Sequence, residues 1–249
     1  MADPVIEVAG LECRYGEHVV LKDLDFSVQR AELLFIAGGS GSGKSTLLRH
    51  LIGLLTPARG TIRYGGRQFQ CVSREDVLPF ARYFGVLFQE GALWSSMTIA
   101  ENISLPLEEH AALSPADRRR LVALKLAQVG LPGVEELSPG ELSGGMRKRA
   151  ALARALALDP AVLFLDEPSS GLDPVSIRQL NALIVGIRKS MGTTMVIVSH
   201  HIESILDIAD RVILLDASVK GIVAQGPPRA LARDSRDERV RAFFGETHS

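Results

Sequence analysis

The chain contains one glycine-rich stretch that indicates its architecture: Gly38-Gly39-Ser40-Gly41-Ser42-Gly43-Lys44-Ser45. This stretch fits the pattern G-x-x-x-x-G-K-[ST]. An apolar run at residues 33–36 precedes it, and a helical pattern from about Lys44 to Leu55 follows it and ends before Pro57. The order of strand, glycine-rich turn and helix predicts a phosphate-binding loop beside a buried sheet.

The residue types in this loop suit phosphate chemistry. Glycine lets the backbone turn its N–H groups toward an anion, where a side chain would block the approach. Lys44 is placed to reach the β- and γ-phosphates, Ser45 to ligate Mg²⁺, and the positive end of the following helix favours the anion. A flexible loop with an incidental lysine is the alternative, but the flanking strand and helix favour a nucleotide. We predict nucleotide contacts from Gly38, Gly39, Ser40, Gly41, Ser42, Gly43, Lys44, Ser45 and Thr46.

Length and composition limit the classes of protein. A chain of 249 residues with 46% hydrophobic content buries a large core, which suits one α/β domain with an insertion or two small lobes. Lys and Arg number 28 against 29 Asp and Glu, so no overall positive charge attracts nucleic acid. We therefore expect no nucleic-acid partner.

Cysteine usage and hydropathy point to a reduced compartment and a chain without a membrane span. Cys13 and Cys71 stand apart and have no His neighbours at ligand spacing, so we expect neither a zinc site nor a disulfide. The first ten residues carry neither a basic leader nor an apolar signal core, and no apolar run approaches about 18 residues. We expect the chain itself to be soluble.

Further strand patterns predict a largely parallel sheet with an antiparallel edge. Short alternating strands are predicted around residues 6–8 and 26–28, with a turn at Tyr15-Gly16-Glu17. Runs typical of buried strands lie at residues 85–88, 162–165, 195–198 and 212–215, with helical patterns between several of them. The stretch from about Ile99 to Leu137 mixes leucines with charges and prolines, which predicts a small helical subdomain.

Two further stretches resemble the ABC ATPase family: Leu142-Ser143-Gly144-Gly145-Met146, followed by Arg147-Lys148-Arg149, and Val162-Leu163-Phe164-Leu165-Asp166-Glu167-Pro168. The resemblance covers nearly the whole chain and includes an ordered set of motifs. It implies an α/β fold, a P-loop NTPase RecA-like core with an antiparallel β subdomain and a small α-helical subdomain. The expected divisions are 1–95 for the β subdomain and first part of the core, 96–145 for the helical signature subdomain, 146–225 for the rest of the core and 226–249 for a charged C-terminal extension.

The acidic pair after the predicted strand 162–165 is the candidate for catalysis. A carboxylate at a strand end suits Mg²⁺ or its water, a role we assign to Asp166. The resemblance implies that Glu167 is the catalytic base that activates the attacking water. A pair of helix-capping acids is the alternative.

The serine and glycines before the helix at about residue 146 suggest a second anion site. Ser143, Gly144 and Gly145 would offer a hydroxyl and backbone N–H groups to an anion. In the resembling family this segment completes the ATP site of the other subunit, so the resemblance implies a head-to-tail, ATP-dependent dimer with a second copy of the chain. Asp173 is expected to link the two ATP sites across that dimer, or to be an ordinary N-cap before Pro174.

Three more residues match family positions. Gln89 matches a glutamine that senses Mg²⁺ and the γ-phosphate, and His200 matches a switch histidine that contacts the γ-phosphate. Tyr15 resembles the aromatic residue that stacks on adenine, or is a turn aromatic. His201 stands where many relatives carry aspartate, and Met146 where glutamine is most common. The adjacent histidines leave the switch open from composition alone, but the register after the apolar strand favours His200.

The stretch 86–102 and Met146 are similar to the ATPase of bacterial MCE-type lipid transport systems, which move phospholipids or related hydrophobic molecules. This implies peripheral attachment to the cytoplasmic face of the bacterial inner membrane. The implied partners are an integral membrane permease, an MCE-domain protein and, in some members, a STAS-domain protein. Leu93 and Trp94 either dock on the permease or pack in the core. Phe243 and Phe244 in the tail either contact a partner subunit or cover the chain's own core.

The expected activity is ATP hydrolysis, with ATP and Mg²⁺ as ligands, coupled to transport through closure of the dimer. The rival functions are an importer ATPase for amino acids or another polar solute and a non-transport ABC ATPase of DNA repair or translation. Repair members insert long coiled coils and translation members carry two cassettes, and this sequence has neither.

Overall fold

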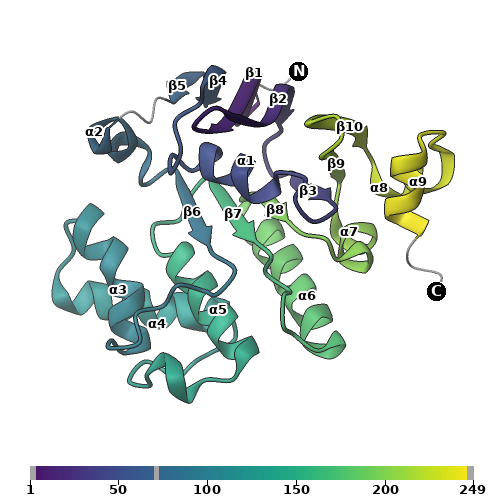
Figure 1. The fold of residues 1–249 in the computed structure, drawn as a ribbon. Coiled ribbons are helices and arrows are strands. Elements are labelled where there is room, and N and C mark those ends of the chain that lie inside the picture. The colour runs from purple at the N-terminus through teal and green to yellow at the C-terminus, as the bar shows by residue number, and fades with distance from the viewer. Residues whose placement is uncertain (1–3, 70–72, 246–249) are drawn as a thin grey trace. The chain divides into compact units, whose positions relative to one another are not determined.

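The structure is a computed structural model that describes residues 4–69 and 73–245 (Figure 1). The chain divides into two compact units. Unit 1 comprises the described residues up to Pro79 together with those from Thr194 onward, and unit 2 is Phe80–Thr193. Each unit carries its own set of the residues singled out in the sequence.

Unit 1 contains a four-stranded antiparallel sheet in the order β2-β1-β4-β5. Its strands are β1 (Ile6–Tyr15), β2 (His18–Val28), β4 (Arg59–Tyr64) and β5 (Arg67–Phe69). Alternate residues of β1 and β2 are buried, as expected for strands with one face on a core. The predicted turn joins β1 to β2, where Gly16 has a φ of 55°. The sequence pattern for β4 and β5 was not recognised.

Unit 1 also contains the strand that carries the glycine-rich loop. β3 (Leu33–Gly38) pairs in parallel with β8 (Thr194–Val198) and β9 (Arg211–Asp216), and β10 (Gly221–Gly226) pairs antiparallel with β9. Every residue of β3 is buried, as is typical of a parallel strand whose two faces are both covered. The loop after β3 therefore leaves from the carboxyl end of a rigid parallel sheet, the usual place for ligand sites in α/β folds.

The helices of unit 1 are α1 (Lys44–Leu51), α2 (Arg74–Val77), α7 (Ile202–Ile208), α8 (Pro228–Asp234) and α9 (Glu238–Gly245). The first of them ends about one turn earlier than the sequence pattern predicted. Gly53 adopts a φ of 77°, and the N–H groups of Leu54 and Leu55 bond back to the carbonyl of Arg49. A left-handed glycine of this kind ends a helix because it reverses the backbone.

The C-terminal helices cover unit 1 itself. Val240 and Phe244 on α9 are buried, and α9 contacts α8 and β10. Of the two roles considered for the tail, this arrangement favours covering the chain's own core. The 3-10 turn Leu78–Phe80 lies at the boundary between the units.

Unit 2 contains a parallel strand pair and four longer helices (Figure 1). β6 (Phe84–Leu87) pairs with β7 (Val162–Asp166). α3 (Ile99–His110), α4 (Pro115–Gln128) and α5 (Gly144–Ala155) contact one another, as predicted for a helical subdomain, and α6 (Pro174–Met191) follows β7. A short 3-10 turn, Pro139–Glu141, precedes α5.

Local sequence determines where these helices begin. Thr98 and Glu101 form a reciprocal capping box at α3, and the Ser114 side chain caps α4 ahead of Pro115. Gly85 allows α5 to end against β6, because a Cβ at this position would lie 1.9 Å from the carbonyl oxygen of Ala155. The end of α5 thus packs directly against β6.

The cysteine and membrane predictions are tested in part. Cys13 is buried and free, and burial, with a smaller effect of Glu12, raises its pKa to about 12. Cys71 lies outside the described residues. Among residues 4–69 and 73–245, no helix is both long and apolar enough to cross a membrane.

Candidate functional site

The glycine-rich loop of unit 1 folds around the ammonium group of Lys44. Lys44 Nζ donates hydrogen bonds to the carbonyl oxygens of Gly38, at 2.8 Å, and Gly39, at 2.9 Å. Gly38, Gly41 and Gly43 have φ values of 147°, 76° and 95°, in the region that side chains disfavour. The loop therefore has the curled backbone that a phosphate cradle requires, with the Lys44 ammonium group bonded to its first two carbonyl oxygens.

Two of the glycines are also required by close packing. A Cβ on Gly38 would lie 2.3 Å from the carbonyl oxygen of Leu215 in β9, and one on Gly43 would lie 2.8 Å from the Leu21 side chain in β2. Gly41 has open space around it. The loop is thus held at both ends by unit 1, while its middle is accessible to a ligand.

The amino end of α1 is suited to an anion. Gly43 precedes this helix without a side-chain cap, and the first turn contains no acidic residue. Gly39, Ser40 and Ser45 are exposed, whereas Ser42 and Thr46 are buried. The N–H groups and hydroxyls at this helix end form an electropositive surface.

Tyr15 lies at the end of the β1–β2 hairpin, with 43% of its surface exposed. Its hydroxyl accepts a hydrogen bond of 2.8 Å from Arg49 Nη1 on α1. The contact fixes the ring relative to the helix that follows the glycine-rich loop. An exposed, tethered aromatic ring is suited to stacking on a flat base.

The two adjacent histidines have different environments. The ring of His201 caps α7, where Nδ1 accepts from the Ser204 N–H at 3.2 Å. His200 is exposed directly after β8. Because the ring of His201 is engaged in helix capping, the structure favours His200 as the histidine that faces a ligand.

Unit 2 carries the two candidate carboxylates at the end of β7. Asp166 is the last residue of the strand, and Glu167, 8% exposed, follows with a φ of 45°. The carbonyl oxygen of Glu167 accepts a hydrogen bond of 3.1 Å from the Ser170 N–H. A left-handed conformation at a non-glycine residue costs about 1–3 kcal/mol and is concentrated at functional sites. The strained turn places Glu167 beside Asp166 at the strand end.

The stretch Leu142-Ser143-Gly144-Gly145-Met146, called the signature segment below, contains the start of α5. Ser143 is the N-cap, and its hydroxyl accepts from the Met146 N–H at 3.3 Å. Ser143 and Gly144 are exposed, and the first turn of α5 contains no acidic residue. This helix end therefore has the properties predicted for a second anion-binding surface.

Asp173 is the N-cap of α6. Its carboxylate accepts from the N–H groups of Val175 and Ser176 and from the Ser176 hydroxyl, and these bonds hold its pKa below the usual value. The capping role that the sequence offered is present. A link across a dimer stays a prediction.

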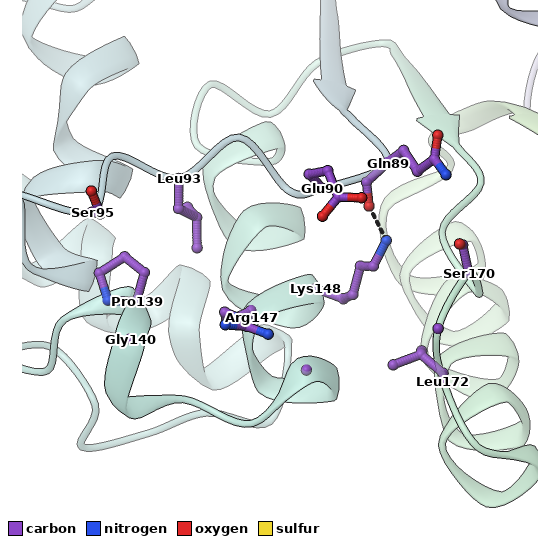
Figure 2. A pocket seen from close by; sticks show the side chains of 12 residues that line it. Gln89, Glu90, Leu93, Ser95, Pro139, Gly140, Arg147, Lys148, Ser170 and Leu172 are labelled. Carbon is purple, nitrogen blue, oxygen red and sulfur yellow. Dashed lines mark hydrogen bonds between the residues drawn. The ribbon is translucent and has the colours of Figure 1, made fainter.

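A cavity of about 470 Å³ in unit 2 lies beside these elements (Figure 2). The residues around it come from the loop after β6, the start of α5 and the segment before α6: Gln89, Glu90, Leu93, Ser95, Pro139, Gly140, Gly144, Arg147, Lys148, Ser170, Gly171 and Leu172. In Figure 2, Lys148 points from α5 toward Gln89 and donates a hydrogen bond to its carbonyl oxygen.

The sequence interpretation assigned no role to Lys148 or Arg154. Arg154, also on α5, donates to the carbonyl oxygens of Gly91, at 2.9 Å, and Ala92, at 2.7 Å. Burial lowers the pKa of both side chains. Both side chains donate to backbone carbonyl groups of residues 89–92, which are far from α5 in the sequence. Contacts of this kind cannot be recognised in a sequence pattern.

The predicted residues fall into two sets. Unit 1 holds the glycine-rich loop, Tyr15 and His200, and unit 2 holds Gln89, Asp166, Glu167, Asp173 and the signature segment. Within residues 4–69 and 73–245, no group of three or more His, Cys, Asp or Glu side chains could hold a metal ion by itself.

Comparisons with known proteins agree with this arrangement. A sequence profile of the family described as "ABC transporter" matches residues 21–170. The "Probable ribonucleotide transport ATP-binding protein mkl" of Mycobacterium tuberculosis is 42% identical over 239 residues, which cover 96% of this chain and 66% of that protein. The chain thus spans slightly less than two thirds of the length of this mycobacterial relative.

A second relative matches over more of its length. The "Intermembrane phospholipid transport system ATP-binding protein MlaF" of Haemophilus influenzae is 37% identical over 244 residues, 98% of this chain and 91% of that protein. Among solved structures, the dimeric ATP-binding cassette MJ0796, in a post-hydrolysis state bound to ADP and Pi, matches with a TM-score of 0.80 and 27% identity. The match covers 89% of this chain and 98% of that chain.

Proposed function

Since this chain belongs to the ABC transporter family, we propose that it is the subunit of a transporter that binds and hydrolyses ATP. Membership confirms the resemblance and the predicted α/β fold with parallel strands and an antiparallel β subdomain. The observation that carries the proposal is the loop folded around Lys44 at the end of β3. In P-loop proteins this arrangement holds the β- and γ-phosphates of a nucleotide.

The residues proposed to act on ATP divide the chemistry between them. Lys44 and the N–H groups at the start of α1 bind the phosphates, and the Tyr15 ring stacks on adenine. Glu167 takes a proton from the attacking water, and His200 contacts the γ-phosphate. General-base catalysis contributes about 10²- to 10⁴-fold, and its efficiency depends on how the carboxylate is positioned.

Magnesium fits the oxygen donors present. The exposed Ser45 hydroxyl, the Asp166 carboxylate and the Gln89 amide oxygen are proposed to hold it. Mg²⁺ prefers oxygen ligands and shares them with substrate phosphates, so a site without a three-residue acidic cluster in the described part of the chain suits it. When bound, the ion neutralises negative charge on the phosphates.

The active form is proposed to be a head-to-tail dimer of two copies. The exposed Ser143–Gly144 end of α5 provides a second anion-binding surface, which would contact the triphosphate held by the other copy. The dimeric state of the similar cassette MJ0796 supports this arrangement. ATP is proposed to bind the closed dimer more tightly than the open one. Closure can then shift the conformational equilibrium of an attached membrane protein by no more than that difference in binding free energy.

Phospholipids or related hydrophobic molecules are the proposed cargo. The support is the similarity to MlaF, whose name specifies intermembrane phospholipid transport, over 98% of this chain. The proposed partners are an integral membrane permease, an MCE-domain protein and a STAS-domain protein. The proposed location is the cytoplasmic face of the inner membrane.

A second candidate cargo is a polar solute. The mycobacterial relative, at 42% identity, is named for ribonucleotide transport. Both candidates use the same ATP chemistry, since selectivity would reside in the membrane and binding subunits.

Isolating the chain from native membranes with its partners tests the function and separates the two cargoes. We expect a membrane permease and phospholipids to co-purify and the complex to hydrolyse MgATP. Recovery of ribonucleotides together with a solute-binding protein would instead support the second candidate. Recovery of the chain without any membrane protein would contradict a role in transport.

Trp94 is proposed to contact the permease. Its side chain is 61% exposed, which argues against core packing, and it lines a pocket of about 560 Å³ with Met97, Leu105, Glu108 and Glu109. Buried Asn102 fixes the backbone beneath the indole: Oδ1 accepts from the Trp94 N–H at 2.8 Å, and Nδ2 donates to the Trp94 and Thr98 carbonyls at 3.1 and 2.9 Å. A rigidly held, exposed aromatic side chain is typical of an interface hot spot.

Trp94→Ala is therefore expected to weaken binding to the co-purified permease by roughly 30-fold, the effect of losing about 2 kcal/mol at a hot spot. The melting temperature of the chain should not change, because the Asn102 contacts use only backbone atoms of Trp94. Leu124→Ala, at a 52% exposed position on α4, is the matched control. Permease binding equal in both variants would contradict the docking role of Trp94.

A further inference from the structure

Lys148 is a buried cation on α5, the helix that begins in the signature segment. It lies in the second turn of α5 and is 9% exposed. Lysine is almost never buried unless its charge is paired and its N–H groups have acceptors, because removing an ammonium group from water is costly. The acceptors of Lys148 therefore indicate what the residue does.

The acceptors are backbone oxygens of two residues assigned to ATP hydrolysis. Lys148 Nζ donates to the carbonyl oxygen of Gln89 and lies 3.5 Å from the carbonyl oxygen of Glu167. Figure 2 shows the first of these contacts, between two residues that line the cavity. One ammonium group thus connects α5, the loop after β6 and the turn after β7.

The charges around Lys148 belong to the same region. Burial lowers the pKa of Lys148, and the carboxylates of Glu90, Asp166 and Glu167 oppose this effect. The ammonium group therefore offsets part of the negative charge of the carboxylates at the end of β7.

The backbone of Glu167 needs such support. Its φ of 45° lies in the left-handed region, which a glutamate adopts only when surrounding contacts hold it there. Two donors converge on its carbonyl oxygen: the Ser170 N–H within the turn and Lys148 Nζ from outside it. Rotation of this peptide group would break both contacts and would redirect the Glu167 side chain.

A second buried lysine in unit 2 provides the comparison. Lys125 on α4 is 1% exposed and pairs with the Asp159 carboxylate at 2.5 Å. Neither partner belongs to a segment assigned to ATP chemistry. Lys125 therefore represents the ordinary structural use of a buried lysine in the same unit.

We propose that Lys148 is a positioning residue for ATP hydrolysis: it holds the backbones of Gln89 and Glu167 in one arrangement and ties both to the signature helix. This inference rests on the proposed hydrolytic roles of Gln89 and Glu167. Ser143 and Gly144 at the start of α5 are proposed to contact the nucleotide held by the other copy. Lys148 therefore also connects that surface to the turn that contains Glu167. Misplacing a catalytic group by about 1 Å can cost roughly 100-fold in rate.

The test compares four variants of the full chain in its native complex: Lys148→Met, Lys148→Arg, Lys125→Met and Glu167→Gln. Lys148→Met keeps the length of the side chain and removes its charge and donors. We expect kcat to fall by about ten- to hundredfold, with KM and the dissociation constant for ATP within about twofold of the parent. Lys148→Arg keeps a charged donor, and the adjacent cavity has room for it, so kcat should recover to within about fivefold.

Lys125→Met separates positioning from folding. We expect it to lower the melting temperature as much as Lys148→Met or more, while leaving kcat within about twofold of the parent. If Lys148→Met does not fold, Lys148→Ala takes its place, because its missing atoms open into the existing cavity, and the same loss of kcat is expected.

Two results would overturn the positioning role of Lys148 without affecting the proposed function. One is an unchanged kcat in a folded Lys148→Met or Lys148→Ala protein while Glu167→Gln is inactive, which leaves the role of Glu167 intact. The other is a loss of kcat that Lys125→Met reproduces at an equal loss of stability. Full activity of Glu167→Gln would instead remove the assigned base, and the positioning proposal would fall with it.

Discussion

Glu167→Gln is expected to bind ATP and form the dimer of two copies but to hydrolyse ATP at least about 100-fold more slowly than the parent. Glutamine has nearly the same shape as glutamate and cannot accept the proton of the attacking water. The backbone contacts of residue 167, from the Ser170 N–H and Lys148 Nζ, do not involve the side chain and are retained. A 100-fold loss corresponds to about 2.7 kcal/mol of transition-state stabilisation.

The measurements are single-turnover hydrolysis of MgATP and the molecular mass in solution with and without ATP. Glu136→Gln, at an exposed position of the same unit, is the matched control and should hydrolyse at the parental rate. Rapid turnover by Glu167→Gln would refute the assigned base. A protein that stays monomeric with saturating MgATP, even in its membrane complex, would contradict the proposed dimer.

Lys44→Ala is expected to weaken ATP binding by roughly 100-fold or more, since a hydrogen bond to a charged group contributes about 1.5–3 kcal/mol and the ammonium group is proposed to contact two phosphates. Without nucleotide the effect should be small. Lys44 is half-buried, and its hydrogen bonds to Gly38 and Gly39 lie within its own loop. We therefore expect the melting temperature to change by only a few degrees.

Thermal unfolding with and without MgATP measures both effects. The parent should be stabilised by nucleotide in proportion to the logarithm of its concentration, and Lys44→Ala should lose that stabilisation at concentrations that saturate the parent. Lys189→Ala, an exposed lysine on α6, should behave as the parent does. An equal shift with ATP in Lys44→Ala would contradict the assignment of the phosphate loop.

The phosphate loop was predictable because its determinants are local. The glycines, Lys44 and the flanking strand and helix occupy fewer than about twenty consecutive residues, and the apolar run of β3 is continuous because the strand is buried on both faces. The short strands β4, β5 and β10 were not predicted. Most of their residues are exposed or half-buried, so they lack the apolar pattern of the other strands.

The site residues were predictable only where the functional side chain lies in a recognisable sequence motif. The residues Gln89, Asp166 and Glu167 follow recognisable strands, and their assigned roles remain predictions for the experiments above. The role proposed for Lys148 was not predictable, because its acceptors are backbone oxygens 59 and 19 residues away along the chain. Asp173 shows the opposite case: its helix cap was foreseen, because the hydrogen bonds of its carboxylate go to residues two or three positions ahead.

The buried amide of Asn102 has a mechanical consequence for this chain. It bonds to the N–H and the carbonyl of Trp94 and to the Thr98 carbonyl, so one buried side chain links Trp94 to the N-cap residue of α3. A displacement of the Trp94 backbone is therefore expected to reach the first turn of α3, because both are hydrogen-bonded to the same buried side chain.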